Sequence, residues 1–206
     1  MAASPVPSEK GPPVSLTDID ASAWAELETA AANPHSGFRY VNLCSVDVEG
    51  RAQARMVVLR SADGSTRSLE FHTDTRSAKW LELSANPEVT VLGFCPQARL
   101  QLRLQGRVER HGPGSEIADA AWNGLPGRTR MTYAGGPPGD ERALETIDVP
   151  VPPDPVDEAE GKARFGVLRF RPRTLDWFEL RQPDNRRAIF AYDETGALAS
   201  CRWVNP

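Results

Sequence analysis

Residues 51–73 read RAQARMVVLRSADGSTRSLEFHT, and this stretch decides the fold class. Its first ten residues are dense in valine and leucine, and a second β-rich run follows at residues 68–73. Asp63 and Gly64 lie between the two runs and are typical of a turn between neighbouring strands. A third strand pattern precedes them at residues 40–48. Three consecutive strands with short turns predict an antiparallel meander and argue against a βαβ nucleotide fold.

The remainder of the chain continues the β pattern. Runs of β-forming residues predict strands at residues 88–95, 99–110, 164–171, 175–180, 187–192 and 198–203. Apolar residues at helical spacing predict helices at residues 21–32, 77–85 and 115–122. Asp20 is the expected cap of the first helix, and Gly106 indicates a bulge in its strand. About eight strands with two or three helices predict a mainly β fold, a barrel with peripheral helices.

The 206 residues suffice for one well-buried core. We expect a flexible N-terminal tail at residues 1–15 and a single domain at residues 16–206. Residues 133–161 hold six of the 18 prolines, several acids and almost no aromatic side chains. Such a segment buries too little surface to offset its ordering entropy, and it predicts an extended or mobile loop.

Composition argues against several classes of function. The formal net charge is −4, the opposite of what a general nucleic-acid binder carries. No apolar run approaches the roughly 18 residues that span a bilayer. The three cysteines lack CxxC spacing and the three histidines lack ligand spacing, so we expect reduced thiols, a cytoplasmic location and no metal site.

Two segments carry cations suited to an anion. Arg55 and Arg60 bracket an apolar strand, and bidentate contact with phosphate is a natural role for a guanidinium group. Their spacing of five points them to opposite faces, so a bulge lies between them, or they serve different parts of a ligand or different subunits, or both are solvated strand ends. Residues 71–79, FHTDTRSAK, place hydroxyls and Lys79 at a helix start, where anions are favoured; the alternative is that Ser77 only caps the helix.

Two later segments offer groups suited to a planar heterocycle. Gln101 lies on a strand opposite a row of leucines, and its amide can hydrogen-bond the polar edge of a flavin. Trp177 could form a wall of such a site and Arg187 a further cation. A solvated strand face and an ordinary core tryptophan are the alternatives.

The order of these segments carries more information than any one of them. R-x-V-x-L-R at Arg55–Arg60 is followed by F-x-T-x-x-x-S-x-K at Phe71–Lys79, by Asn86-Pro87 and a valine-rich strand, and by Q-x-R-x-x-G at Gln101–Gly106. A late tryptophan and arginine complete the pattern. The chain resembles the FMN-binding domain of the pyridoxamine 5′-phosphate oxidase family, well over residues 38–110 and more loosely over residues 164–206.

The resemblance implies an FMN-binding split β-barrel of antiparallel Greek-key type, with FMN at the interface of a homodimer. Arg55, Ser77 and Lys79 would bind the phosphate, and His72 and Thr73 would contact the flavin or the ribityl chain. The full set of implied cofactor-binding residues is Arg55, Met56, Val57, Val58, Leu59, Arg60, His72, Thr73, Ser77, Lys79, Gln101, Trp177 and Arg187.

The chain departs from the family where the vitamin B6 substrate binds. Pro183–Arg187 reads PDNRR, without the first arginine and the histidine of the family's R-x-H-D-R motif, and Arg60 replaces a lysine. The resemblance implies an FMN-dependent oxidoreductase acting on a pyridoxamine or pyridoxine phosphate held by Arg60 and Arg130, or on another small molecule. The alternatives are a flavin-binding protein without turnover, and a barrel holding haem or a deazaflavin. Scarce histidine argues against haem, and no side chain stands out as a general base.

Overall fold

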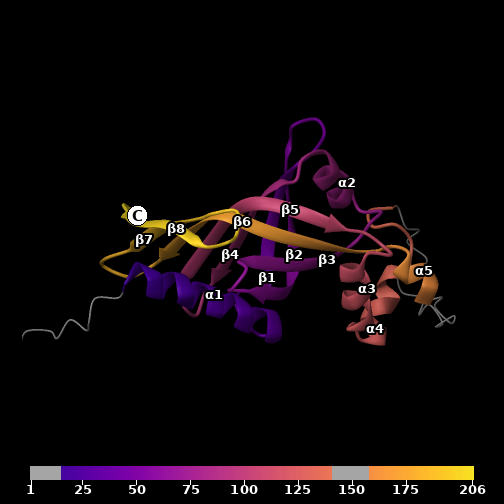
Figure 1. Ribbon diagram of the computed structural model, residues 1–206, viewed down its shortest axis with the longest axis horizontal. Helices are drawn as coiled ribbons and strands as arrows, with labels where there is room; N and C mark the ends of the chain where they lie inside the picture. Colours follow the sequence, from indigo (N-terminus) through magenta and orange to yellow (C-terminus); the bar gives the residue numbers. More distant parts are fainter. Residues whose placement is uncertain (1–14, 141–157) are drawn as a thin grey trace, which may run out of the picture.

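A computed structural model describes residues 15–140 and 158–206, and in these ranges an antiparallel sheet of eight strands dominates (Figure 1). The sheet order is β3-β2-β1-β4-β5-β6-β7-β8, and β3 also pairs with β6. Strands β1 to β6 therefore close into a barrel, with β4 returning beside β1 in a Greek-key arrangement, and β7 and β8 extend the sheet beyond it. The predicted mainly β barrel is confirmed. The strands are β1 (Tyr40–Val46), β2 (Ala52–Asp63), β3 (Ser68–Asp74), β4 (Glu88–Cys95), β5 (Leu100–His111), β6 (Phe165–Glu179), β7 (Arg186–Tyr192) and β8 (Leu198–Val204).

The helices lie around the barrel (Figure 1). Helix α1 packs on β2 and β8, and α2 follows β3 at the opposite end of the molecule from β8. Helix α3 packs on β6, with α4, η1 and α5 beside it. Across the two described ranges, none of these helices has the length and apolar character to cross a membrane. Their bounds are α1 (Leu16–Ala32), α2 (Ala78–Ala85), α3 (Glu116–Asn123), α4 (Gly127–Arg130), the 3-10 helix η1 (Met131–Tyr133) and α5 (Glu158–Lys162).

Helix α1 begins earlier than its sequence pattern predicts. Ser15 is the N-cap, and its hydroxyl accepts a hydrogen bond from the Asp18 backbone N–H at 3.1 Å. The expectation that Asp20 caps the helix is wrong. Asp20 lies on the buried face of the helix, where its carboxylate accepts from Arg67 and from the hydroxyl of Tyr192, each at 2.5 Å. The Asp20 carboxylate therefore binds Arg67 and Tyr192, which are distant in sequence, and does not cap the helix as the local sequence pattern predicted.

The two strands expected at residues 164–171 and 175–180 are one continuous strand, β6. Pro172 interrupts the sequence pattern but not the strand, because its partner in β5 is Gly106, where the register shifts. A bulge is therefore present, but its extra residue is Arg173 of β6, so the bulge lies in the partner strand and not, as predicted, in the strand of Gly106. A Cβ atom at this position would lie 2.1 Å from the carbonyl oxygen of Arg171.

We expect Gly106→Ala to destabilise the fold by about 1–3 kcal/mol, because the methyl group meets backbone that cannot move without distorting the sheet. Urea denaturation measures the change. Gly127→Ala is the matched control, since a Cβ atom there meets nothing within 4 Å. A Gly106→Ala variant as stable as the control would show that the strand pair tolerates a side chain at the bulge.

The core consists of two clusters. The larger fills the barrel and the space under α1. The smaller, around Trp122, Tyr133 and Phe165, joins α3 and η1 to the outer side of β6. Tyr133, which opens the expected loop at 133–161, is buried here, and α5 closes that segment. The rest of the expected loop, residues 141–157, and residues 1–14 of the expected tail lie outside the described residues.

Candidate functional site

One cluster of cations and hydroxyls forms where β3 passes into α2. Thr73 and Ser77 are both buried there, and the ammonium group of Lys79 donates to Thr73 Oγ1 at 3.0 Å and to Ser77 Oγ at 3.4 Å. Ser77 stands at the N-cap position of α2, yet its hydroxyl donates to the carbonyl of Asp74 at 2.7 Å and makes no capping bond. Burial, together with the nearby charge of Arg55, lowers the pKa of Lys79. The hydroxyls therefore hold Lys79 instead of capping the helix.

Arg55 joins this cluster from β2. It lies on the same strand face as the buried Val57 and Leu59, and so it points into the α2 end of the barrel. Its Nη1 donates to Ser45 Oγ and to the carbonyl of Leu43, and its Nη2 donates to Glu82 Oε2 at 2.7 Å. Two segments, β2 and the passage from β3 into α2, thus bring Arg55, Thr73, Ser77 and Lys79 together.

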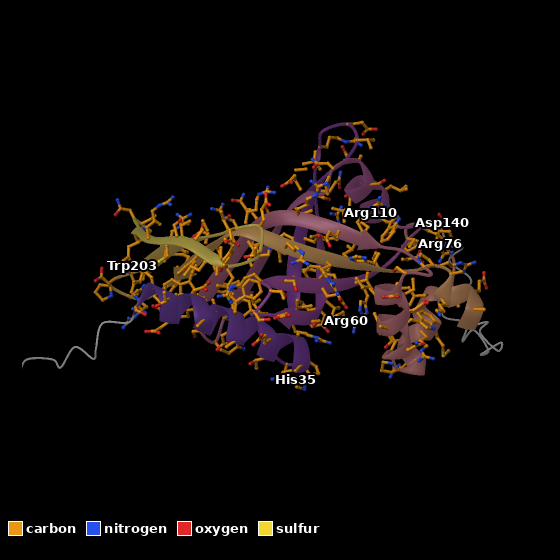
Figure 2. All side chains as sticks on the ribbon, in the orientation of Figure 1. His35, Arg60, Arg76, Arg110, Asp140 and Trp203 are labelled. Carbon is orange, nitrogen blue, oxygen red and sulfur yellow. The ribbon has the colours of Figure 1, made fainter. Side chains whose placement is uncertain are left out.

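Arg60 lies elsewhere. The β2–β3 register shifts between Leu59 and Ser61, so the bulge considered between Arg55 and Arg60 is at Arg60 itself. Figure 2 shows Arg60 on the side of the barrel toward α3 and α4. Burial lowers the pKa of Arg39, and the positive charge of the nearby Arg60 lowers it further. Burial raises the pKa of Tyr133, and the charge of Arg60 opposes that rise. Arg55 and Arg60 therefore serve different places.

The four residues between the two arginines alternate along the strand. Val57 and Leu59 are buried in the barrel core, whereas Val58 is half-buried and Met56 is exposed. Side chains of successive strand residues point to opposite faces, so Met56 and Val58 lie on the outer face of the sheet. Only the two outer side chains could contact a ligand or a partner from that face.

His72 and Arg130 also belong to the outer side of the barrel. The imidazole ring of His72 meets Phe165 edge-on at 5.0 Å, and its Nε2 lies 3.5 Å from a carboxylate oxygen of Glu70. Neither ring nitrogen has a hydrogen-bond partner in the described parts of the chain. Arg130 stacks over Trp122 at 5.7 Å. Because side chains alternate along β3, His72 faces away from its sequence neighbour Thr73.

Tyr133 is the residue of this outer region that the sequence did not single out. Its ring meets Phe165 edge-on at 5.1 Å, and its pKa responds to Arg60, which places its hydroxyl near that cation. Its aromatic character in a segment otherwise poor in aromatics is the signal that could have found it.

Gln101 and Arg187 lie together at the other end of the sheet. Both pair with Phe178 of β6 and so share the outer face. Arg187 donates to Asp176 through Nε at 2.9 Å and Nη2 at 2.7 Å, and Arg103 donates to the same carboxylate at 2.6 Å. Burial alone would raise the pKa of Asp176, but the bonds from Arg187 and Arg103 outweigh it and lower the pKa.

Trp177 occupies the opposite face from Gln101 and Arg187. It is buried in the main core and meets Trp203 edge-on at 6.3 Å. Trp177 is therefore a core tryptophan, which was the alternative to a wall of the cofactor site. Its ring meets the exposed Trp203.

The group around Lys79 and the group around Gln101 are far apart in one chain. Trp80 of α2 stacks on Arg110, and from Gln101 to Arg110 strand β5 spans about 30 Å at roughly 3.3 Å per residue. Figure 2 shows Arg76, next to Ser77, and Trp203 at opposite ends of the molecule. The two groups therefore lie in different parts of the protomer.

An apolar patch lies on the outer face of the sheet between these groups. Tyr40, Met56 and Phe94 are 56%, 58% and 45% exposed, and they come from three adjacent strands, β1, β2 and β4. Phe94 pairs directly with Gln101. Contiguous exposed apolar surface of this kind marks an interaction site.

Comparison with known proteins extends this geometry. Residues 21–112 match the model of the pyridoxamine 5′-phosphate oxidase FMN-binding domain. Over this stretch, just under half of its length, the chain is similar to that FMN-binding domain. The match covers β1 to β5 and α2, and so includes Arg55, Thr73, Ser77, Lys79 and Gln101.

The curated proteins that this chain resembles match different shares of its length. Pyridoxine/pyridoxamine 5′-phosphate oxidase 2 of Arabidopsis thaliana is 28% identical over 89% of this chain and 96% of its own. The oxidase of Caulobacter vibrioides is 36% identical, but over 49% of this chain and 46% of its own, so this chain spans about half of that relative.

Solved structures agree on the fold. A pyridoxamine 5′-phosphate oxidase-related, FMN-binding protein of Nostoc punctiforme has a TM-score of 0.73 at 27% identity, over 90% of this chain and 96% of its own. PhzG of Burkholderia lata has a TM-score of 0.67 at 19% identity, over 94% of each chain, and shares the fold. Within the described ranges, no three His, Cys, Asp or Glu side chains are grouped to hold a metal ion.

Proposed function

We propose that this chain is an FMN-dependent oxidoreductase whose FMN lies at the interface of a homodimer. The cluster around Lys79 supports the proposal most directly. Three of the five N–H groups of the Arg55 guanidinium donate to Leu43, Ser45 and Glu82, which leaves two. Two of the three N–H groups of the Lys79 ammonium donate to Thr73 and Ser77, which leaves one N–H group. These remaining donors suit a phosphate group.

The isoalloxazine ring of bound FMN would accept a hydride from a small substrate and pass the electrons to oxygen or another acceptor. In our proposal the chain's own residues anchor and orient this ring. Arg55 and Lys79 hold the phosphate, and the amide of Gln101 reaches the polar edge of the ring. His72 on the outer face of β3 and Arg187, fixed by Asp176, complete the site.

A second copy of the chain supports the composite site. Gln101 lies about 30 Å along β5 from Arg110, whose guanidinium stacks on Trp80 of α2, and this separation supports a site in which each of two protomers supplies one group. The patch of Tyr40, Met56 and Phe94 offers an apolar surface beside Gln101. A two-fold axis through this patch would place the Gln101 group of one protomer near the Lys79 group of its partner.

For the substrate we propose a pyridoxamine or pyridoxine phosphate or another small molecule carrying an anionic group. The Arg60 side chain makes no hydrogen bond or ion pair within the described ranges, and its positive charge acts on the Tyr133 hydroxyl. Arg130 is held over Trp122 in the same region. The oxidases of Arabidopsis and Caulobacter bear names of that substrate class. Pro183 and Asn185, which replace the arginine and histidine of the family motif, favour the alternative of a flavin-binding protein without turnover.

Steady-state turnover with pyridoxamine 5′-phosphate and oxygen tests this assignment, and anaerobic mixing tests it further. An oxidase consumes oxygen in proportion to substrate and its FMN bleaches when oxygen is withheld. Full FMN loading with no bleaching by pyridoxamine or pyridoxine phosphate would refute these substrates and favour the binding protein.

Lys79→Met is expected to weaken FMN binding by about 1.5–3 kcal/mol, since it removes a charge-assisted bond to the phosphate. Riboflavin, which lacks the phosphate, should bind the variant as it binds wild type. Lys162→Met is the control, because Lys162 pairs with Asp119 on α3, away from the cluster. Titration of flavin fluorescence gives the affinities. Wild-type FMN affinity in Lys79→Met would mean that the phosphate binds elsewhere.

A further inference from the structure

Glu82 is a buried acidic group beside the cluster proposed for the FMN phosphate. We infer that Glu82 is an internal counter-ion that competes with this phosphate for Arg55 and keeps FMN affinity below the level that the cations alone would give. The inference rests on the proposed function and assigns a role to a residue that neither the sequence motifs nor the comparisons single out.

The contacts of Glu82 point into the cluster. Its Oε2 accepts from Ser45 Oγ at 2.6 Å and from Arg55 Nη2 at 2.7 Å, and its side chain is 9% exposed. Glu82 also lies close enough to Lys79 to raise the pKa of that amine, against the larger lowering by burial. One carboxylate therefore acts on both cations proposed to hold the phosphate.

Anchoring of Arg55 does not by itself require this charge. The guanidinium also donates to two neutral acceptors, Ser45 Oγ and the carbonyl of Leu43, and the Arg55 side chain is 21% exposed. A buried ion pair is weak evidence for stability, because its desolvation cost offsets the attraction. The negative charge of Glu82 has a clearer consequence for a ligand than for the fold.

Charge counting gives the direction of that consequence. Arg55 and Lys79 carry two positive charges, and Glu82 reduces the sum to one. A phosphate monoester carries about −1.5 to −2 at neutral pH, so Glu82 takes one donor of Arg55 and repels the incoming dianion. Riboflavin has no phosphate and does not respond to this charge. Glu82 thus sets the preference for FMN over riboflavin and makes bound FMN exchangeable.

Glu82→Gln is the sharpest test. Arg55 and Ser45 both donate to Oε2 of Glu82, and an amide oxygen at that position can accept from both, so the two contacts persist while the charge is lost. We expect about tenfold tighter FMN binding, from the Coulomb energy of one charge within the same cluster. Riboflavin affinity should change by less than about twofold, since the removed interaction is with the phosphate. Glu82→Met, also uncharged, should shift affinity in the same direction and replaces Glu82→Gln if that variant does not fold.

Glu88→Gln is the matched control, because it removes the same charge from an exposed pair with Arg173. Flavin fluorescence titration of the full chain measures all affinities. Tighter FMN binding in Glu82→Gln alone supports the inference. Unchanged or weaker FMN binding in that variant, with normal binding by wild type, overturns the inference and leaves the proposed function standing. No FMN binding by wild type overturns both.

Discussion

Arg55→Ala is expected to destabilise the protein by about 3–5 kcal/mol, beyond any effect on a ligand. The substitution removes the cation that pairs with Glu82 and leaves a carboxylate inside the barrel end, where Ser45 is its remaining side-chain hydrogen-bond partner among the described residues. The cost is asymmetric, because Arg55 retains neutral acceptors and some solvent when Glu82 is the residue replaced. Urea denaturation followed by tryptophan fluorescence gives the free energy of unfolding.

A double variant separates the buried charge from lost packing. Arg55→Met with Glu82→Met removes both charges and should recover most of the stability that Arg55→Met alone loses. Arg173→Met is the control for a cation in an exposed pair, and we expect it to cost less than about 1 kcal/mol. An Arg55→Met variant no less stable than this control would contradict the assignment of Glu82 as a buried, charge-paired group.

Asp20→Ala is the second substitution with a large expected effect, about 3–5 kcal/mol. Its carboxylate, 3% exposed, accepts from Arg67 and Tyr192. Burial and the bond to Asp20 raise the pKa of Tyr192 above its ordinary value, so the phenol stays protonated and donates. Loss of the carboxylate leaves the Arg67 cation without its counter-charge and removes one polar link between α1 and β7, while the bond from Trp24 Nε1 to the Tyr192 hydroxyl at 3.0 Å remains.

The comparison of two substitutions on α1 makes this prediction specific. Asp20→Asn keeps an acceptor for one of the two donors and should cost less than Asp20→Ala. Glu26→Ala, at an exposed position of the same helix, should change the unfolding free energy by less than about 0.5 kcal/mol. Thermal unfolding monitored by circular dichroism measures all three. Equal stability of Asp20→Ala and Glu26→Ala would show that the contacts of Asp20 with Arg67 and Tyr192 contribute nothing to stability.

The features that sequence predicts well are local ones. β2, β3 and α2 are consecutive in the chain, so the alternation of residues 51–60, the turn at Asp63 and Gly64, and the hydroxyls before Lys79 all act over a few residues. Gly106 marks the place of the bulge between β5 and β6 by the same local logic, since only a missing side chain lets β6 pass so close. The barrel and the core of the candidate site were predictable for this reason.

The features that sequence does not predict depend on distant partners. From the sequence, Asp20 resembles a helix cap. In the fold its carboxylate instead accepts a hydrogen bond from Tyr192, 172 residues away. From the sequence, Glu82 resembles a surface residue of a short helix. In the fold it is buried against Arg55 of β2 and Ser45 of β1. β6 remains one strand through Pro172 because Gly106 of β5 has no side chain where β6 bulges at Arg173, and residues 164–180 alone do not show this partner.

One measurement tests the central claim that the Lys79 and Arg55 cluster binds a phosphate. Apo-protein titrated into FMN and, separately, into riboflavin reports both affinities through quenching of flavin fluorescence. The structure predicts saturable binding of about one FMN per protomer, with riboflavin at least about tenfold weaker because it lacks the charge-assisted bonds. Equal affinity for the two flavins, or FMN fluorescence unchanged by the protein, would contradict it.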